Sequence, residues 1–189
     1  MSGWREGGWL ESARPVVSPN QGERPAGVEV SLVVLHNISL PPDDFGGAWV
    51  EHFFTNQLDR TAHPYFSEIA DLQVSAHFFV RRDGQVVQFV GCDQRAWHAG
   101  RSSWCERENC NDYSIGIELE GSDFQAYAAT QYGALWALID ALRQHYPISA
   151  LAGHCHIAPG RKTDPGPFFD WVAVRQRYAD LALPAEVGT

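Results

Sequence analysis

Three prolines and three glycines interrupt the segment GHCHIAPGRKTDPGP, which occupies residues 153–167. Proline lacks a backbone N–H and fixes φ, whereas glycine permits conformations that are closed to other residues. The segment therefore predicts a shaped loop that forms neither a helix nor a long strand. An apolar stretch, residues 148–152, precedes it and a helix-like stretch, residues 170–179, follows it. We expect its polar side chains at the end of a strand, where mixed α/β folds place their chemistry.

Lys162 in this loop is the only lysine in the sequence, because the other thirteen of the fourteen basic residues are arginines. Lysine is a compact point charge whose pKa shifts readily, whereas the guanidinium group stays charged and planar. The place of Lys162 therefore suggests chemistry that arginine does not supply. The alternative is an ordinary solvated side chain.

Length and charge limit the classes of function. A chain of 189 residues with 44% hydrophobic residues and seven tryptophans suits one domain with a sizeable core. Its net charge of -9 and pI near 5.2 disfavour nucleic acid and anionic membranes as partners. No apolar run approaches the roughly eighteen residues of a membrane span, and the first residues lack a signal-peptide pattern. We therefore expect a cytoplasmic protein, a small soluble substrate, and no nucleic-acid or membrane partner.

The four cysteines, at positions 92, 105, 110 and 155, do not form a C-x-x-C pair. They are too few and too irregularly spaced for a disulfide scaffold in a chain of this length. Reduced thiols are the simplest interpretation, although Cys105 and Cys110 share one loop and could pair in an exported protein.

Three stretches predict buried strands. VEVSLVVLH, residues 28–36, is a β-branched run that we expect to end at His36. VSAHFFVRRDGQVVQFVG, residues 74–91, predicts a hairpin around Asp83-Gly84, with His77 inside its first strand. YSIGIELE, residues 113–120, alternates apolar residues with Gly116, Glu118 and Glu120, so one face carries two carboxylates.

Helices are expected over residues 48–58, after a cap at Thr130 and up to Pro147, and over residues 170–179. Residues 1–28 have little periodicity and predict an ordered arm on the surface of one domain that spans residues 29–182. Residues 183–189 predict a frayed tail. We find no internal repeat.

Two histidines of this pattern follow strands and can converge if the strands are neighbours. His36 ends the first strand and His154 begins the shaped loop. Catalytic zinc needs a third protein ligand and an open position, for which Cys155, His156 and Asp164 are candidates. A side chain at i+1 in an extended chain points away from its neighbour, which disfavours Cys155. Spacing alone leaves His156 and Asp164 equal.

Five motifs resemble one known family, and the similarity as a whole runs from about Gly8 to Trp171. They are VVLHNISL, SAHFFVRRDG, AWHAG, NDYSIGIELEG and GHCHIAPGRKTDPGPFFDW. The resemblance is to the cytosolic anhydro-N-acetylmuramyl-L-alanine amidases, which share the fold of the zinc amidases and peptidoglycan recognition proteins. It implies a single α/β domain in which a central mixed β-sheet is flanked by helices.

The same resemblance implies the roles of the site residues. It implies one Zn²⁺ held by His36, His154 and Asp164, which decides the third ligand against His156. It also implies that Glu118 acts on the attacking water and that Lys162 assists at the reacting carbonyl. The expected substrate is a soluble anhydromuropeptide, cut between the sugar acid and L-alanine, and we expect a monomer.

Four further residues lie beside the motifs and are candidates for binding sugar and peptide, because aromatic faces, amides and a guanidinium suit these groups. They are Asn37, Trp97, His98 and Arg161; ordinary packing is the alternative for each. Two other functions are open: a module that binds muropeptides without cutting them, and an exported amidase that acts on whole peptidoglycan. Retention of Glu118 and Lys162 disfavours the first, since binding alone needs no activated water.

Overall fold

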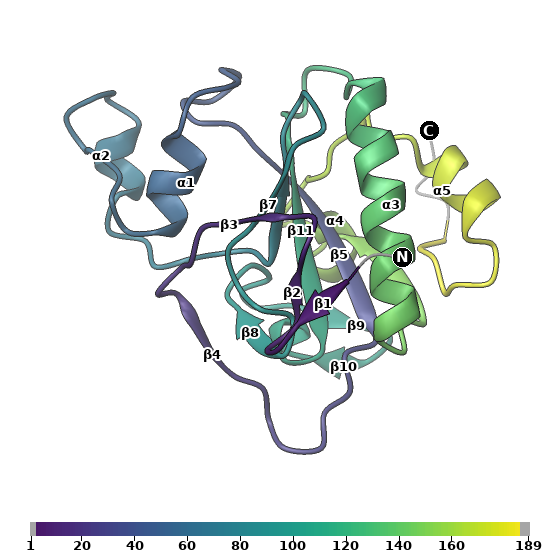
Figure 1. Ribbon diagram of the computed structural model, residues 1–189. Coiled ribbons are helices and arrows are strands. Elements are labelled where there is room, and N and C mark those ends of the chain that lie inside the picture. The colour runs from purple at the N-terminus through teal and green to yellow at the C-terminus, as the bar shows by residue number, and fades with distance from the viewer. Residues whose placement is uncertain (1–2, 186–189) are drawn as a thin grey trace.

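The fold is built on one six-stranded mixed β-sheet, seen in a computed structural model that describes residues 3–185 (Figure 1). The strands from one edge to the other are β12 (Ala150–Gly153), β5 (Leu32–Ile38), β11 (Ser114–Glu120), β6 (Phe78–Val80), β7 (Val86–Gln88) and β3 (Arg14–Pro15). The first four are parallel to one another, and β7 runs antiparallel to β6. The expected central mixed sheet is confirmed.

The neighbouring strands β5 and β11 are buried on both faces of the sheet, which suits the apolar run at the start of β5. All seven residues of β11 are buried, as are the first five of β5. The prediction that the first strand ends at His36 was wrong, because β5 continues to Ile38 through its pairing with β11. His36 therefore lies within a paired strand, which restrains its backbone.

The hairpin around Asp83-Gly84 is confirmed. Val80 pairs with Val86 across the turn, and Gly84 has a φ of +87°, a conformation that favours glycine. His77 lies just before β6 rather than inside it. Its Nδ1 accepts a hydrogen bond from the Gly116 backbone at 3.0 Å, so it is a buried structural histidine.

Helices cover both faces of the sheet (Figure 1). α3 (Ala129–His145) and α5 (Trp171–Arg177) lie on one side, where their apolar side chains share a core with Val33, Leu35 and Ile117. α1 (Trp49–Phe54) and α2 (Phe66–Ile69) form a lobe on the other side, with a second apolar cluster around Phe54 and Phe89.

The boundaries of several helices differ from the sequence-based expectation; α5, for example, covers Trp171–Arg177 rather than residues 170–179. α1 ends at Phe54 rather than at residue 58, because Asn56 has a φ of +59° and Gln57 N–H returns to the His52 carbonyl at 2.7 Å. α3 begins before Thr130. Its first turn is closed by Gln131 Oε1, which accepts from Ala128 N–H at 3.0 Å, while the Thr130 hydroxyl donates to the carbonyl of residue 82.

The remaining strands belong to the N-terminal arm and to a long loop. In the arm, β1 (Trp4–Arg5) pairs with β2 (Trp9–Leu10), and β4 (Gln21–Glu23) pairs with β8 (Gln94–Ala96). In the loop, β9 (Ser103–Trp104) and β10 (Arg107–Glu108) form a hairpin that leads into a 3-10 helix, Cys110–Asp112. The domain boundaries at residues 28 and 182 stay predictions, and residues 186–189 of the predicted tail lie outside the described part of the chain.

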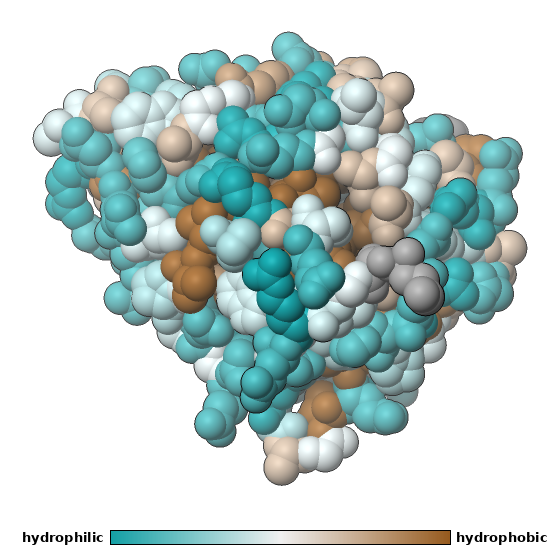
Figure 2. Space-filling view, viewed as in Figure 1, coloured by the Kyte–Doolittle hydropathy of each residue, from teal (hydrophilic) through white to brown (hydrophobic). Residues whose placement is uncertain are grey.

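The surface of the face seen in Figure 1 is largely hydrophilic, with apolar side chains exposed only in limited areas (Figure 2). Among the helices described for residues 3–185, none is long and apolar enough to cross a membrane. In the same part of the chain the four cysteines are free thiols.

Arg24 holds the arm against the domain through its guanidinium group. It donates to the carbonyl oxygens of Cys92, Asn111, Asp112 and Ser114 at 2.9–3.2 Å. Burial lowers its pKa to about 10, so the group keeps its charge at neutral pH. One arginine thus connects the arm to the long loop and to the start of β11.

We predict that Arg24→Ala lowers the free energy of unfolding by about 3 kcal/mol, because several carbonyls lose a charged donor at once. Urea unfolding monitored by tryptophan fluorescence measures the change. Arg60→Ala is the control, since Arg60 pairs with Asp71 on the exposed surface and its removal should change little. Equal midpoints for Arg24→Ala and the wild-type protein would contradict the assigned role.

Candidate metal centre and catalytic cleft

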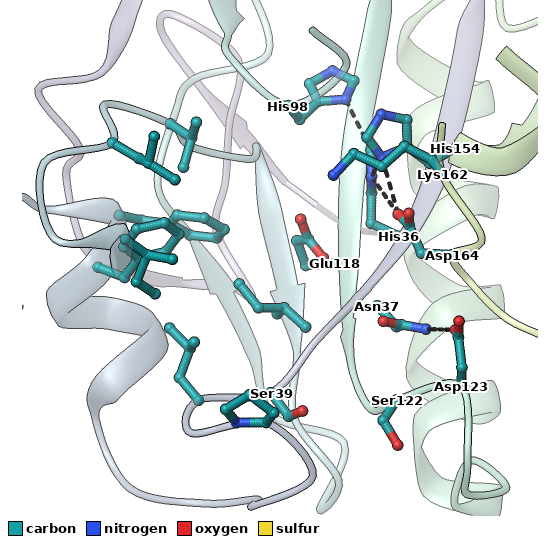
Figure 3. A pocket seen from close by; sticks show the side chains of 18 of the residues that line it. His36, Asn37, Ser39, His98, Glu118, Ser122, Asp123, His154, Lys162 and Asp164 are labelled. Atoms are coloured by element: carbon teal, nitrogen blue, oxygen red, sulfur yellow. Dashed lines mark hydrogen bonds and ion pairs between the residues drawn. The ribbon is translucent and has the colours of Figure 1, made fainter. Parts of the chain in front are cut away.

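Three predicted ligands converge at the end of the sheet (Figure 3). β12 pairs with β5 up to Gly153 and Leu35, so His154 follows at the level of His36 on the neighbouring strand. The Nδ1 atoms of the two histidines lie 3.0 Å apart, and each lies 3.0 Å from Oδ2 of Asp164. The three donor atoms therefore form a nearly equilateral triangle.

The loop geometry that places Asp164 opposite the histidines comes from backbone contacts. Cys155 N–H donates to the Asp164 carbonyl at 2.9 Å, which folds the loop back onto its own start. The Tyr127 hydroxyl donates to the Pro165 carbonyl at 2.7 Å. Ten residues of loop thus close into a ring that presents the carboxylate to His154.

The outer nitrogen of His154 is bonded to a backbone carbonyl. Its Nε2 lies 3.1 Å from the Ala99 oxygen, which accepts only, so Nε2 carries the proton. In the neutral ring the inner atom Nδ1 is then unprotonated and turns its lone pair toward Asp164.

His36 has the same tautomer, with its proton on Nε2, because of two further side chains. The Ser114 hydroxyl donates to the Cys110 carbonyl at 2.5 Å, so its oxygen accepts from Nε2–H of His98 at 3.2 Å. Nδ1 of His98 is then free to accept from Nε2–H of His36 at 2.9 Å. The inner Nδ1 of His36 is therefore also unprotonated in the neutral ring.

Two bare imidazole nitrogens and a carboxylate oxygen thus face one another, an arrangement that a cation stabilises. Burial lowers the pKa of His36 to about 4, which favours the neutral ligand form. Tetrahedral zinc with ligand bonds of about 2.0–2.1 Å needs donor atoms about 3.3 Å apart, so the residues present fit this ion.

His98 lies behind His36 rather than on the open surface. It is 9% exposed, and both of its ring nitrogens bond to protein atoms. A Cβ on Gly116 of β11 would come within 2.5–2.7 Å of the imidazole, so glycine at this position admits the ring. Burial lowers the pKa of His98 well below its usual value. In this position His98 can orient the ring of His36. Contact of His98 with substrate stays a prediction.

His156 lies away from the three donors. The prediction that the loop contains no helix was wrong, because residues His154–Ile157 form one turn, α4. His156 Nδ1 accepts from Gly153 N–H at 2.9 Å and its ring contacts Trp171 edge-on. Sequence reasoning treated this segment as extended, and the helical turn removes the basis for placing His156 on the same face as His154.

Glu118 is the register partner of His36 on β11, so both side chains leave the same face of the sheet. Its carboxyl group is buried, and Oε2 has no hydrogen-bond partner among residues 3–185. Burial, and secondarily the charge of Asp164, raise the pKa of Glu118 well above its usual value. Figure 3 shows Glu118 and Lys162 on the side of the three donors that faces the cavity.

Glu120, the second carboxylate on this face of β11, has a structural place in the fold. It is 3% exposed, and its two carboxylate oxygens accept from the backbone N–H groups of Gly46 and Arg82 at 2.5 and 2.8 Å. The second carboxylate of this face therefore connects two loops.

The donors open into a cavity of about 440 Å³, within the range of small-molecule sites. One end is polar and contains the three donors with Glu118 and Lys162. The opposite wall is apolar and comes largely from α1, α2 and the segments that adjoin them: Leu40, Phe53, Phe54, Tyr65, Ile69, Leu72 and Val74. The cavity therefore suits a molecule with both a reactive polar group and apolar surface.

The other predicted substrate contacts occupy different places. Asn37 and Trp97 line the cavity, and Asn37 Nδ2 donates to Asp123 Oδ1 at 2.9 Å. Arg161 donates to the carbonyls of Ala99 and Arg101 at 3.0 and 2.6 Å, and it lines a neighbouring hollow instead. Substrate binding by these residues stays a prediction.

Sequence reasoning missed two kinds of residue. Ser122, Asp123 and Phe124 line the cavity just after β11, and Phe124 is 75% exposed there. An aromatic residue in the loop that follows a predicted strand was an available signal. The supporting partners Ala99 and Ser114 carried no signal, because their contribution is one backbone or hydroxyl oxygen each.

Comparisons with known proteins agree with this geometry. Residues 26–167 match the model of the family described as N-acetylmuramoyl-L-alanine amidase. The chain is 57% identical over 170 residues to the 1,6-anhydro-N-acetylmuramyl-L-alanine amidase AmpD of Citrobacter freundii, covering 89% of this chain and 91% of that protein.

Two solved structures are also similar. A crystal structure of an AmpD selenomethionine derivative superposes with a TM-score of 0.88 at 56% identity, covering 92% of this chain and 97% of the other. The Escherichia coli amidase AmiD, in complex with anhydro-N-acetylmuramic acid-L-Ala-D-γ-Glu-L-Lys, gives 0.58 at 27% identity, covering 96% and 67%. The expected zinc-amidase fold is confirmed.

We predict that Asp164→Ala lowers the zinc content of the purified protein. The variant loses the anionic donor and keeps only the two neutral histidines. His156→Ala should retain zinc and lose only about 1 kcal/mol of stability with the bond to Gly153 N–H. Elemental analysis after dialysis measures the first effect and urea unfolding the second. The reverse pattern of zinc contents would make His156 the ligand.

Proposed function

Because the chain belongs to the N-acetylmuramoyl-L-alanine amidase family, we propose that it hydrolyses the amide bond between 1,6-anhydro-N-acetylmuramic acid and L-alanine in peptidoglycan recycling. The names of its relatives support the substrate class, and the free anhydromuropeptide is the form that suits a cavity of this size. We further propose that the protein acts as a monomer in the cytoplasm.

We propose zinc as the cofactor, held by His36, His154 and Asp164. Two imidazoles and one carboxylate with an open position are a donor set that zinc prefers. Zinc in such a site supplies Lewis-acid chemistry, since it polarises a carbonyl oxygen and acidifies water. The protein contributes the orientation of the donors, which the outer bonds to His98 and Ala99 support.

Glu118 is the proposed general base and acid. Its raised pKa suits proton transfer near neutral pH better than that of an exposed carboxylate. Its Oε2 has no hydrogen-bond partner among residues 3–185, and the carboxyl group accepts a proton from the attacking water in this proposal. The same carboxyl group then gives this proton to the amine of L-alanine as the C–N bond breaks.

Lys162 is the proposed electrostatic partner of the reacting carbonyl. Its ammonium group lines the same cavity, and its charge lowers the pKa of Glu118 against the effects of burial and Asp164. Negative charge develops on the carbonyl oxygen in the tetrahedral state, and a cation that is already in place stabilises it. The apolar wall accommodates the methyl groups and the less polar face of the substrate.

The observation that carries the proposal is the convergence of three unprotonated donor atoms in the same cavity as a buried carboxyl oxygen that has no partner in the described part of the chain. Neither a structural ion pair nor simple binding of a peptide requires both features. A hydrolase needs the first to hold a metal and the second to move a proton.

Hydrolysis of purified anhydromuramyl-tripeptide, followed by chromatography, tests the function. We expect the protein as isolated to release free tripeptide, the chelator-treated protein to release none, and restored zinc to return the activity. Release that is unchanged after complete removal of metal would overturn the metal-dependent mechanism. Stoichiometric zinc without any release would indicate a module that binds muropeptides.

We predict that Glu118→Gln retains zinc and the fold but reduces kcat by about 100- to 10,000-fold, the usual contribution of a general acid–base group. Glutamine keeps the shape of the side chain, so loss of packing does not explain the effect. Steady-state kinetics together with elemental analysis of the same preparation measure both quantities. A kcat near that of the wild-type protein would remove Glu118 from the mechanism.

A further inference from the structure

Asn111 bonds to both residues that support the metal-binding histidines. Its Oδ1 accepts from His98 N–H at 3.1 Å and from Ala99 N–H at 2.9 Å. These neighbouring residues supply the acceptors for Nε2–H of His36, at the His98 ring, and for Nε2–H of His154, at the Ala99 carbonyl. One amide oxygen therefore fixes the dipeptide on which both ligand orientations depend.

We propose that Asn111 is a positioning residue of the metal centre, acting on His36 and His154 through residues 98 and 99. This inference rests on the proposed function, because it requires a metal at the three donors. Asn111 does not itself contact the three donor atoms. It bonds to the backbone of His98 and Ala99, and these two residues contact the rings of His36 and His154.

The position of Asn111 is itself restrained. It lies in the 3-10 helix Cys110–Asp112, and its carbonyl accepts from Arg24 Nη1 at 3.2 Å. The dipeptide is held from the other side as well, since Arg161 donates to the Ala99 carbonyl at 3.0 Å. Asn111 therefore connects Arg24 of the arm to His98 and Ala99, the residues that contact the two histidine rings.

The geometry also explains why position 111 needs the oxygen of an amide or a carboxylate. A carbonyl-type oxygen has two lone pairs and accepts two N–H groups at once. Alanine at this position leaves both N–H groups without their acceptor, so the backbone of residues 98 and 99 loses its restraint on this side. A shift of this backbone moves the His98 ring and the Ala99 carbonyl together, and both ligand rings lose part of their orientation.

The test compares zinc affinity by competition with a chromophoric chelator in wild-type protein and in Asn111→Ala. We expect Asn111→Ala to bind zinc about 10- to 100-fold more weakly, the usual effect of losing an outer partner of metal ligands. We also expect Asn111→Asp to bind zinc nearly as tightly as the wild-type protein, because a carboxylate oxygen accepts the same two N–H groups.

Gln88→Ala is the matched control. Gln88 is a buried amide whose Oε1 accepts from Leu10 N–H and whose Nε2 donates to the Gly8 carbonyl, both at 2.8 Å. Its loss destabilises the fold at the arm without a bond to residues 98 or 99. We expect Gln88→Ala to lower the midpoint of urea unfolding and leave zinc affinity unchanged.

A second measurement reads the histidine rings without metal. In the metal-free wild-type protein, ¹⁵N NMR should show protons on Nε2 of His36 and His154, whereas Asn111→Ala should show mixed tautomers. If Asn111→Ala does not fold, Asn111→Ser replaces it, since its oxygen lies one bond closer to the backbone and reaches the two N–H groups poorly.

The outcomes separate this inference from the proposed function. Tight zinc binding by the wild-type protein, with equal affinity and tautomers in Asn111→Ala, would overturn the role of Asn111 and leave the zinc site intact. Equal weakening in Asn111→Ala and Gln88→Ala would also overturn it, because global destabilisation would then explain the effect. Absence of zinc binding by the wild-type protein would refute the zinc site and this inference with it.

Discussion

Parallel pairing of β5 with β11 is the constraint on which the site depends. It places His36 beside Glu118, so a proposed metal ligand and the proposed base leave the same face of the sheet at the same level. β12 extends this arrangement on the other side of β5 and delivers His154 one residue after its last pair. Backbone hydrogen bonds between the strands thus set the distances between the reacting groups. Flexible side chains alone would not fix these distances.

A second layer of hydrogen bonds then selects the chemistry of the ligands. Each histidine gives its outer N–H to a fixed acceptor and thereby keeps its inner nitrogen bare. The acceptors come from one loop that lies against β11, and Gly116 provides the space for it. The N-terminal arm contributes to the same set of hydrogen bonds, because Arg24 donates to the carbonyls of residues 111, 112 and 114 at the end of this loop.

Sequence patterns were informative where the local chain determines the structure. The hairpin at Asp83-Gly84 and the alternation around Glu118 follow from turn chemistry and two-residue periodicity. The choice between His156 and Asp164 did not follow from spacing, because it depends on a helical turn at residues 154–157 and on a loop closed by a backbone bond from Cys155. The supporting role of Asn111 depends on contacts across the fold, and the motif around it contains no periodic signal. The resemblance to known amidases supplied the ligand set that local reasoning left open.

The cavity is assembled from two separately packed parts of the molecule. The donors stand on the sheet and its adjoining loop, whereas the apolar wall belongs largely to the cluster formed around α1 and α2. Substitutions in that cluster alter the shape offered to a ligand while the sheet keeps the reacting atoms in place. The ligand that the cavity accepts and the reaction at the donors can therefore change independently, since they depend on different residues.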